Sequence, residues 1–357
     1  MLLRQLWLKN FRNYKNLDIY FENGTTIITG DNGNGKTNLV ESIAWLANGK
    51  SFRGTPNEAL VRQNEDNAII RAEIFEKERK TTLEAQINKR GRNLVQVNGK
   101  KINKTKEIQE KIKVTLFSPD DLILIKGSPN ERRNYIDELL VDLHPKNLLI
   151  KNNFEKALKQ RNMLLKQAKG KLTTEIKTTL DVWDQKVAET GEELVEKRKE
   201  AINFLIPIFN DLLKTFSKNE ENVLFLYEKS WTTENLFESL KTTRDKDLRR
   251  GMTTSGPHRD DLEIKINTLL ARNHSSQGEQ RSLALCLRLA GHEVIKQTLG
   301  VEPIVLLDDV FSELDQRRCD ILVELLPKTQ SVLTTAGQVP KGISSSNTYC
   351  ITEGKIK

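Results

Sequence analysis

Hydrophobic positions along the chain change their spacing twice. Residues 1–118 show a mixture that predicts an N-terminal strand, a strand followed by a helix, and then hairpins. From about residue 119 to residue 250 the spacing is helical, with interruptions near Pro145, Gly170 and Pro207 that predict helix ends. The mixed pattern returns at about residue 251. The chain is therefore predicted to be an α/β head, made by residues 1–118 and 251–357, into which a helical arm domain of residues 119–250 is inserted.

A glycine-rich loop separates a strand from a helix in the predicted head. The stretch "IITGDNGNGKTNLVES" fits G-x-x-x-x-G-K-[ST], and apolar residues recur at helical spacing after it. The glycines allow several backbone N–H groups to face one anion, and the helix N-terminus adds a partial positive charge. A turn that binds nothing is the alternative, but strand, loop and helix all agree with a phosphate site. The predicted nucleotide-binding residues are Gly30, Asp31, Asn32, Gly33, Asn34, Gly35, Lys36, Thr37 and Asn38, with Lys36 at the β- and γ-phosphates and Thr37 on Mg²⁺.

An acidic pair supplies the expected metal partner. In "EPIVLLDDVFSELD" the apolar run that ends at Leu307 predicts a buried central strand, followed by Asp308 and Asp309. Ligands gather at the carboxyl ends of parallel strands, so Asp308 is predicted to hold Mg²⁺ and Asp309 to polarise the attacking water. Two acids at an ordinary helix start are the alternative. Because Lys36 and Asp308 are far apart in the sequence, they can meet only if the head closes behind the arm.

A third motif, "SSQGEQRSLALCLRLAGHEV", predicts a helix with a well-defined start. Ser276 and Glu279 have the spacing of a capping box, in which each side chain accepts from the other residue's backbone N–H. The same helix end is also a possible anion site. Since this helix is not the one that carries Lys36, an anion bound here would belong to a second head.

Positive charge is concentrated in one stretch of the chain. The formal net charge is +8, and nine basic residues but two glutamates lie between Lys89 and Lys113. This stretch contains "LVQVNGKKI", whose alternation around Asn-Gly predicts a hairpin. A basic hairpin could contact a phosphate backbone, although lysines that block pairing at a sheet edge give the same pattern. The predicted DNA-binding residues are Lys89, Arg90, Arg92, Lys100, Lys101 and Lys104.

The rest of the sequence points to a cytoplasmic protein. No uncharged apolar run reaches the roughly 18 residues that a membrane span needs, and the N-terminal segment has no small-residue cleavage site. Cys286, Cys319 and Cys350 are odd in number and widely spaced, which argues against a disulfide framework or a metal site. Cys286 lies in an apolar helical pattern and is predicted to be in the core.

Together these motifs resemble a known family. The phosphate loop, "SSQGEQR", "VLLDDVFSELD" and the N-terminal "LWLKNFRNYKNLDIYFENG" are similar to an ATP-binding-cassette head of the chromosome-maintenance type. "GKSFRG", "FSPDDLILIKGSPNERRNYIDELL" and "SGPHRDDLEI" resemble motifs of the RecF family of bacterial recombination-mediator ATPases. The resemblance covers nearly the entire chain, and these last strings are far more specific than the phosphate loop.

The resemblance implies an ATP-dependent head-to-head dimer. Each site would take its loop from one chain and Ser276 and Gly278 from the other, with Asp315 at the dimer seam. Arg12 falls where such heads place a nucleotide-contacting arginine, although taken alone it is typical of a surface arginine. RecF-like proteins bind DNA when ATP-bound, act with RecR and RecO at single-strand gaps, and help load the recombinase RecA. The implied function is a DNA-binding ATPase switch of recombinational repair that hydrolyses ATP slowly, with ATP and Mg²⁺ as cofactors.

Some positions depart from the broader cassette pattern. Asp309 stands where many cassette ATPases have glutamate, and Glu279 where the signature usually has glutamine. No histidine follows the last predicted strand, so Thr334 or Thr335 would sense the γ-phosphate. No nucleophile neighbours His258 and Arg259, which are interpreted as head–arm or dimer contacts.

Three other classes of function fit the sequence less well. A transporter ATPase subunit is disfavoured by the bulky helical arm and by the basic hairpin. A Rad50- or SMC-type tether needs a coiled coil longer than this arm. A small-molecule kinase would be expected to work as a monomer with an acceptor site. DNA stimulation of ATP hydrolysis separates the leading hypothesis from the transporter.

Overall fold

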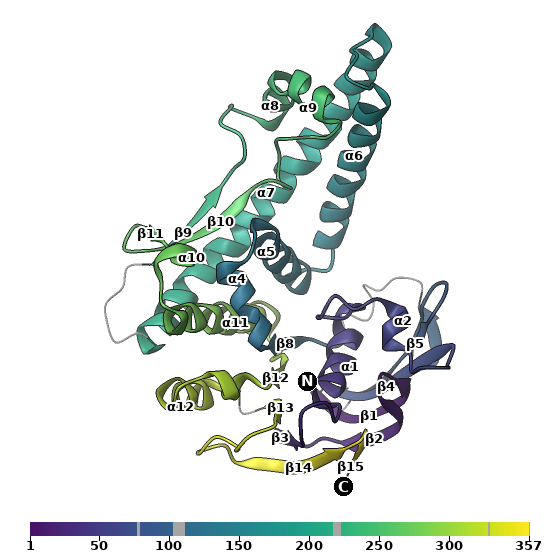
Figure 1. Cartoon of the computed structure of the whole chain (residues 1–357), viewed down its shortest axis with the longest axis vertical. Coiled ribbons are helices and arrows are strands. Elements are labelled where there is room, and N and C mark those ends of the chain that lie inside the picture. Colours follow the sequence, from purple (N-terminus) through teal and green to yellow (C-terminus); the bar gives the residue numbers. More distant parts are fainter. Residues whose placement is uncertain (77–78, 103–110, 217–222, 328, 357) are drawn as a thin grey trace. The chain divides into compact units, whose positions relative to one another are not determined.

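The computed structural model describes residues 1–76, 79–102, 111–216, 223–327 and 329–356 (Figure 1). They divide into two units, one of residues 1–121 and 291–357 and one of residues 122–290. Helix α11 (Gln277–Leu299) carries the chain from the second unit back into the first.

A mainly parallel sheet in the first unit is assembled from distant parts of the chain. Its described strands follow the order β15-β14-β3-β13-β12-β8, parallel except for β15, which turns back on β14. Every residue of β12 and β13 is buried, as expected for central strands. The strands are β3 (Gly24–Thr29), β8 (Val114–Phe117), β12 (Ile304–Asp308), β13 (Gln330–Thr335), β14 (Ser345–Thr352) and β15 (Lys355–Ile356).

Helix α1 (Lys36–Asn48) packs against β8, β12 and β13 of this sheet. The residues predicted to line its apolar face are all buried, so the strand–loop–helix prediction is confirmed. The helix ends where Gly49 adopts a positive φ of 69° and donates its N–H to the Trp45 carbonyl, a conformation that glycine adopts without strain.

An antiparallel sheet contributes to the same core. Its described order is β2-β1-β4-β5-β6-β7. Asn98 and Gly99 turn between β6 and β7 with φ of 50° and 75°, which is the hairpin predicted from Asn-Gly. The strands are β1 (Leu2–Phe11), β2 (Tyr14–Tyr20), β4 (Asn67–Glu76), β5 (Arg79–Asn88), β6 (Leu94–Val97) and β7 (Lys100–Ile102). The short helices are α2 (Asn57–Leu60), η1 (Pro119–Leu122), η2 (Val310–Glu313) and α12 (Gln316–Leu325).

The second unit is mainly helical. Helices α6 and α7 pack along each other and are joined through Lys169 and Gly170, both with positive φ (Figure 1). The breaks predicted near Pro145 and Gly170 are confirmed. Its helices are α4 (Ile123–Lys126), α5 (Pro129–Leu143), α6 (Asn147–Gln167), α7 (Thr174–Phe216), α8 (Leu236–Thr242), α9 (Arg244–Arg250) and α10 (Ala271–His274), and its strands are β9 (Val223–Glu228), β10 (Asp261–Ile266) and β11 (Leu269–Leu270).

The helix end predicted near Pro207 is wrong, because α7 continues through this proline. Proline removes one backbone donor and crowds the preceding turn. Buried side chains nevertheless continue at helical spacing on both sides, with Ile202 and Leu205 before the proline and Phe209 and Leu213 after it. Packing of this face therefore outweighs the local cost of the proline.

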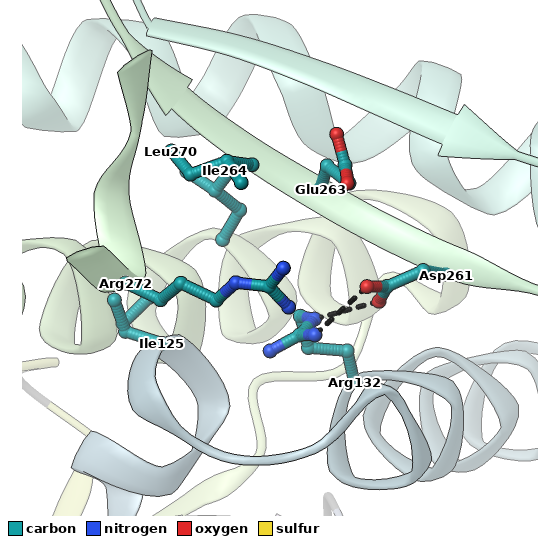
Figure 2. Close-up of a pocket in the computed structure, with 7 residues that line it drawn as sticks. All are labelled: Ile125, Arg132, Asp261, Glu263, Ile264, Leu270 and Arg272. Atoms are coloured by element: carbon teal, nitrogen blue, oxygen red, sulfur yellow. Dashed lines mark hydrogen bonds and ion pairs between the residues drawn. The ribbon is translucent and has the colours of Figure 1, made fainter.

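The second unit extends past the predicted end of the arm at residue 250. Strand β10 pairs with β9, and Arg132 of α5 donates to both carboxylate oxygens of Asp261 in β10, at 2.8 and 2.9 Å (Figure 2). These contacts tie the segment after residue 250 to the helices before it, as far as Ala290. The predicted functional division, with an ATPase head of residues 1–118 and 251–357 and a helical arm of residues 119–250, stays a prediction.

A buried ionic network joins α6, α7 and α9. Arg161 donates to Asp184 at 2.6 Å and to Asp247 at 2.7 Å, and all three side chains are inaccessible to solvent. Arg244 also pairs with Asp184 and with the more exposed Asp181. Charges buried in this way must stay paired, because an isolated buried charge is costly.

Two predictions about the whole chain can be compared with the described residues. None of their helices is long and apolar enough to cross a membrane. Cys286 is fully buried, as predicted, and the three cysteines are not joined in disulfides.

Candidate nucleotide-binding site

The glycine-rich loop leaves β3 and enters α1 with a backbone that side chains would obstruct. Gly30 and Gly35 have φ of 141° and 112°. A Cβ on Gly30 would stand 2.3 Å from the Ile351 carbonyl oxygen, and one on Gly35 would stand 2.5 Å from the Asn13 amide. Lys36 is buried, and its ammonium group donates to the carbonyls of Gly30 at 2.8 Å and Asp31 at 3.0 Å. The ammonium group therefore lies inside the curve of the loop.

Two residues that sequence reasoning missed hold this loop in place. Asn13 donates to the Asn34 carbonyl at 2.9 Å and accepts from Asn38 at 2.8 Å. Tyr14, which is fully buried, donates its hydroxyl to the Gly35 carbonyl at 2.9 Å. The sequence feature that could have pointed to them is "NFRNY", whose polar residues make the tight turn between β1 and β2. Only the fold shows that this turn faces the phosphate loop.

The turn between β14 and β15 fixes the loop from the other direction. Gly354 donates its N–H to the Asn34 carbonyl at 3.2 Å, and the N–H of Glu353 donates to the Asn34 side chain at 3.4 Å. Asn34 is thus bound by two turns that are far apart in the sequence. The loop has little freedom to change shape.

The predicted metal-binding residues come together at the end of β12. The Thr37 hydroxyl donates to Asp308 Oδ1 at 3.0 Å, and the Thr334 hydroxyl donates to the same oxygen at 2.8 Å. Burial raises the pKa of Asp308, and the negative charge of Asp309 adds to this rise. The hydrogen bonds from the two hydroxyl groups and the positive charge of Arg53 act in the opposite direction. The head therefore closes as predicted, although the metal-binding role itself stays a prediction.

Asp309 is the first residue after β12, and its backbone lies in the left-handed region, with φ of 51°. Its N–H donates to the Thr334 carbonyl at 3.1 Å, and its Oδ1 atom is buried without a hydrogen-bond partner in the described residues. A buried carboxylate oxygen of this kind normally has a donor or a cation beside it. The strand end allows the two adjacent acids to serve one site.

These residues fit a Mg²⁺-bound nucleoside triphosphate. Hydroxyl and carboxylate oxygens are the ligands that Mg²⁺ prefers, and this ion usually takes one or two protein ligands with phosphate oxygens and water. The described residues contain no cluster of three or more His, Cys, Asp or Glu side chains that could hold a metal by themselves. A metal held at Thr37 and Asp308 would thus need further ligands from a nucleotide and from water.

Arg12 lies in a hydrogen-bonded network of its own. It donates to both oxygens of the fully buried Glu41, at 2.8 and 2.9 Å, and to the Thr55 hydroxyl at 2.8 Å. The Ser51 hydroxyl also donates to Glu41. Arg12 is thus fixed beside "GKSFRG", and its nucleotide contact stays a prediction. Arg53, from the same string and exposed, is a residue that the sequence reasoning did not assign. Burial raises the pKa of Asp308, and the charge of Arg53 acts against that rise.

The signature residues lie in the second unit. The Ser276 N–H donates to Glu279 at 2.6 Å, and the Glu279 N–H donates to the Ser276 hydroxyl at 3.3 Å. The capping box is therefore confirmed, with Gly278 in the first turn of α11. A role for Ser276 and Gly278 toward a partner's nucleotide stays a prediction.

The predicted DNA-binding residues are exposed where the structure describes them. Lys100 and Lys101 lie on β7, and Lys89, Arg90 and Arg92 lie in the turn from β5 to β6. Lys104 lies outside the described residues. Lys113, which belongs to the same basic stretch, is buried.

The remaining candidates have structural partners. Asp315 caps α12 by accepting the Arg318 N–H at 2.9 Å, and this hydrogen bond lowers its pKa. Thr335 accepts the Gly337 N–H at 3.1 Å. His258 packs against Phe154, with ring centroids 6.1 Å apart, and burial lowers its pKa to about 4.

Comparisons with known proteins agree on one family. Residues 2–338 match the family model described as "RecF/RecN/SMC N terminal domain". The chain is 36% identical to "DNA replication and repair protein RecF" of Streptomyces avermitilis, over the full length of both chains. A solved structure described as the recombination mediator protein RecF with ATP, in the RecFOR pathway, superposes with a TM-score of 0.92 at 30% identity, covering 99% of this chain and 96% of that one. An Smc head domain from Pyrococcus furiosus, 20% identical with a TM-score of 0.57 over 99% and 95% of the two chains, shares the fold.

The P-loop head with its inserted helical segment, the specific motifs and these full-length similarities agree. The chain belongs to the RecF family, within the RecF/RecN/SMC N-terminal domain group.

Proposed function

We propose that this chain is an ATP-dependent DNA-binding protein of DNA replication and recombinational repair. The observation that carries the proposal is the meeting of the phosphate loop with the end of β12, where Thr37 and Thr334 both donate to Asp308. The relatives named for DNA replication and repair, and the related structure described with ATP, support the same conclusion.

In this proposal the loop residues bind the triphosphate and orient it. The ammonium group of Lys36 would give up its hydrogen bonds to the carbonyls of Gly30 and Asp31 and donate to β- and γ-phosphate oxygens instead. Thr37 and Asp308 would hold Mg²⁺. When bound, Mg²⁺–ATP supplies the phosphoryl group that is transferred to water. Asp309 would accept a hydrogen bond from that water and orient it. Thr334, fixed on Asp308, would report the presence of the γ-phosphate.

ATP would also join two copies of the chain. The N-terminus of α11, with Ser276 and Gly278, would close over the nucleotide held by the partner's loop. The product of hydrolysis is then a change of assembly, so we infer a weak, DNA-dependent ATPase that acts as a switch. Slow turnover would set how long the dimer stays on DNA.

The partners follow from the same proposal. The exposed basic hairpin would contact the phosphate backbone of duplex DNA or of junctions between duplex and single strands. RecR and RecO would act with the ATP-bound dimer at gaps and assist loading of a RecA-type recombinase. The RecFOR pathway in the description of a related structure supports this grouping.

The test is DNA binding with ATP, with ADP and without nucleotide, over a range of protein concentrations. We expect tight binding with ATP only, rising with the population of dimer. Equal binding in all three states would contradict an ATP switch, and ATP-driven dimerisation without any DNA binding would point to another function.

A further inference from the structure

Exposed basic side chains from three segments of the second unit form what we name the basic track. Its members share exposure to solvent and a position near the junction of α6 with α9 and the "SGPHRDD" loop. They are Lys159 and Lys166 on α6, Arg250 at the end of α9, and Arg259 in the loop. These residues are outside the hairpin, which belongs to the first unit.

Contacts between neighbours connect the members of the track. On α6, Asn162 accepts the Thr253 N–H at 2.7 Å, which joins the helix to the loop. A Cβ on Gly251, the residue after Arg250, would stand 3.4 Å from Cγ of Lys166. The guanidinium group of Arg259 lies 3.3 Å from the Met252 sulfur. The three segments therefore present one continuous surface.

The members of the basic track differ in their ion pairing from some other lysines of the second unit. Within the described ranges, no carboxylate forms an ion pair with any of its four members. Three lysines on α7 do have such partners, since Lys186, Lys197 and Lys214 each pair with an acid three residues away, at 3.4, 2.7 and 3.0 Å. Unpaired cations that lie together repel one another, so a cluster of them is stabilised by an anion.

The loop that carries Arg259 has a rigid base. Asp247 accepts from the Thr254 N–H at 2.9 Å and from its hydroxyl at 2.6 Å, and Asp247 is itself part of the buried network. After Arg259, the carboxylate of Asp260 accepts from the Ser230 N–H at 2.8 Å. Anchors on both sides fix the backbone at Arg259, which reduces the cost of ordering this loop when an anion binds.

His258 does not add charge to this surface. Burial lowers its pKa to about 4, with Arg259 and Arg133 acting in the same direction, so the ring is neutral at pH 7. Its Nδ1 atom is buried without a hydrogen-bond partner in the described residues. The ring supports the loop, and the neighbouring arginines carry the positive charge.

The spacing along α6 suits a regular polyanion. Lys159 and Lys166 are two helical turns apart, about 10 Å along the axis, which matches about three phosphate steps of one strand in duplex DNA. A surface hollow of about 370 Å³ runs between them, lined also by Leu158, Asn162, Met163 and Glu155. The carboxylate of Glu155 faces Lys151 at 3.9 Å, so it is partly neutralised.

The helix dipole accounts for the position of only one member of the basic track. Arg250 in the last turn of α9 interacts favourably with the helix dipole, but this effect is confined to that turn and does not involve Lys159, Lys166 or Arg259. We propose that the basic track binds the phosphate backbone of DNA, as a second contact independent of the hairpin. This inference rests on the proposed DNA binding and assigns a role to Arg259 of the "SGPHRDD" motif.

The experiment compares the salt dependence of duplex DNA binding, with ATP, for four proteins. They are the unaltered chain, a track variant (Lys166→Ala, Arg250→Ala, Arg259→Ala), a hairpin variant (Lys100→Ala, Lys101→Ala) and a control (Lys186→Ala, Lys197→Ala, Lys214→Ala) that loses the same charge as the track variant. The logarithmic salt slope should become shallower by about 0.9 for each DNA phosphate that a variant no longer neutralises. We expect this in the track and hairpin variants, with the control close to the unaltered chain. Thermal unfolding and ATP binding of the track variant should be unchanged.

The outcomes separate this inference from the proposed function. If the hairpin variant weakens and the track variant matches the control, the inference is overturned while the proposed function stands. If the unaltered chain does not bind DNA with ATP, both fail. If the track residues affect binding of polyglutamate but not of DNA, the track takes an acidic protein and the inference is overturned.

Discussion

Replacing Asp247 by alanine removes a buried carboxylate whose oxygens are both occupied. Oδ2 accepts from Arg161 at 2.7 Å, and Oδ1 accepts from the backbone and hydroxyl of Thr254. Breaking a buried ion pair by removing one partner costs about 3–5 kcal/mol. Arg161 keeps Asp184, which reduces the loss, while the backbone N–H of Thr254 loses its acceptor at about 1–3 kcal/mol. We therefore expect the free energy of unfolding of the second unit to fall by about 4 kcal/mol.

The matched control is Asp181→Ala, which makes the same chemical change on the same helical unit. Asp181 also pairs with an arginine, Arg244, at 2.7 Å, but its side chain is 47% exposed. Exposed pairs contribute about 0–1 kcal/mol, so this variant should stay within that range. Urea unfolding followed by circular dichroism, which reports mainly on the helices of the second unit, measures both. Equal losses in the two variants would refute the argument that burial of the network decides its contribution.

Four further outcomes are expected. Lys36→Met should weaken ATP binding at least tenfold in a titration with a fluorescent nucleotide, because it removes the charge inside the loop; unchanged affinity would contradict the assigned phosphate contact. Asp309→Asn should bind ATP normally, lose hydrolysis and remain longer on DNA as the ATP-bound dimer, and normal phosphate release would exclude its role. Ser276→Arg should fold and bind ATP but fail to dimerise with it in sedimentation, whereas Ser276→Ala, which removes a helix cap, costs only about 1 kcal/mol; a full dimer population of the arginine variant would mean that α11 does not close over the partner's nucleotide. Burial lowers the pKa of His258 from 6.5 to about 4, so as pH falls through this range the unfolded chain binds a proton that the folded chain does not. The free energy of unfolding should therefore drop by up to about 3 kcal/mol between pH 6.5 and pH 4. The drop should be smaller in His258→Asn, and parallel plots of unfolding free energy against pH for the two proteins would show that this ring is not the cause.

Much of the site could be predicted because its motifs are local. The phosphate loop and the acidic pair each occupy one strand end, and strand, loop and helix signals agree at each. The anchors of the loop escaped prediction because Asn13, Tyr14 and Gly354 reach it only through pairings between distant strands. No short-range pattern distinguishes a turn that supports a loop from a turn that faces water.

The fold shows the same division between local and long-range causes. The Asn-Gly hairpin and the start of α11 follow from neighbouring residues and are confirmed. The helix through Pro207 and the extent of the second unit depend on packing and on β9–β10 pairing, which outweigh the local signals. A role in binding DNA or a partner's nucleotide depends on molecules outside the chain and stays a prediction.

The interleaved order of the parallel sheet has a consequence for synthesis of the protein. Strand β3 lies between β13 and β14, whose residues leave the ribosome some three hundred positions later. The antiparallel sheet pairs strands that are close in sequence, so it can form early. Strand β3 has no partner on either edge until β13 and β14 have been synthesised. Such long-range pairing makes folding slow and leaves apolar edges open to aggregation. The residues around Lys36 and Asp308 can therefore come together only after β12 and β13 have been synthesised.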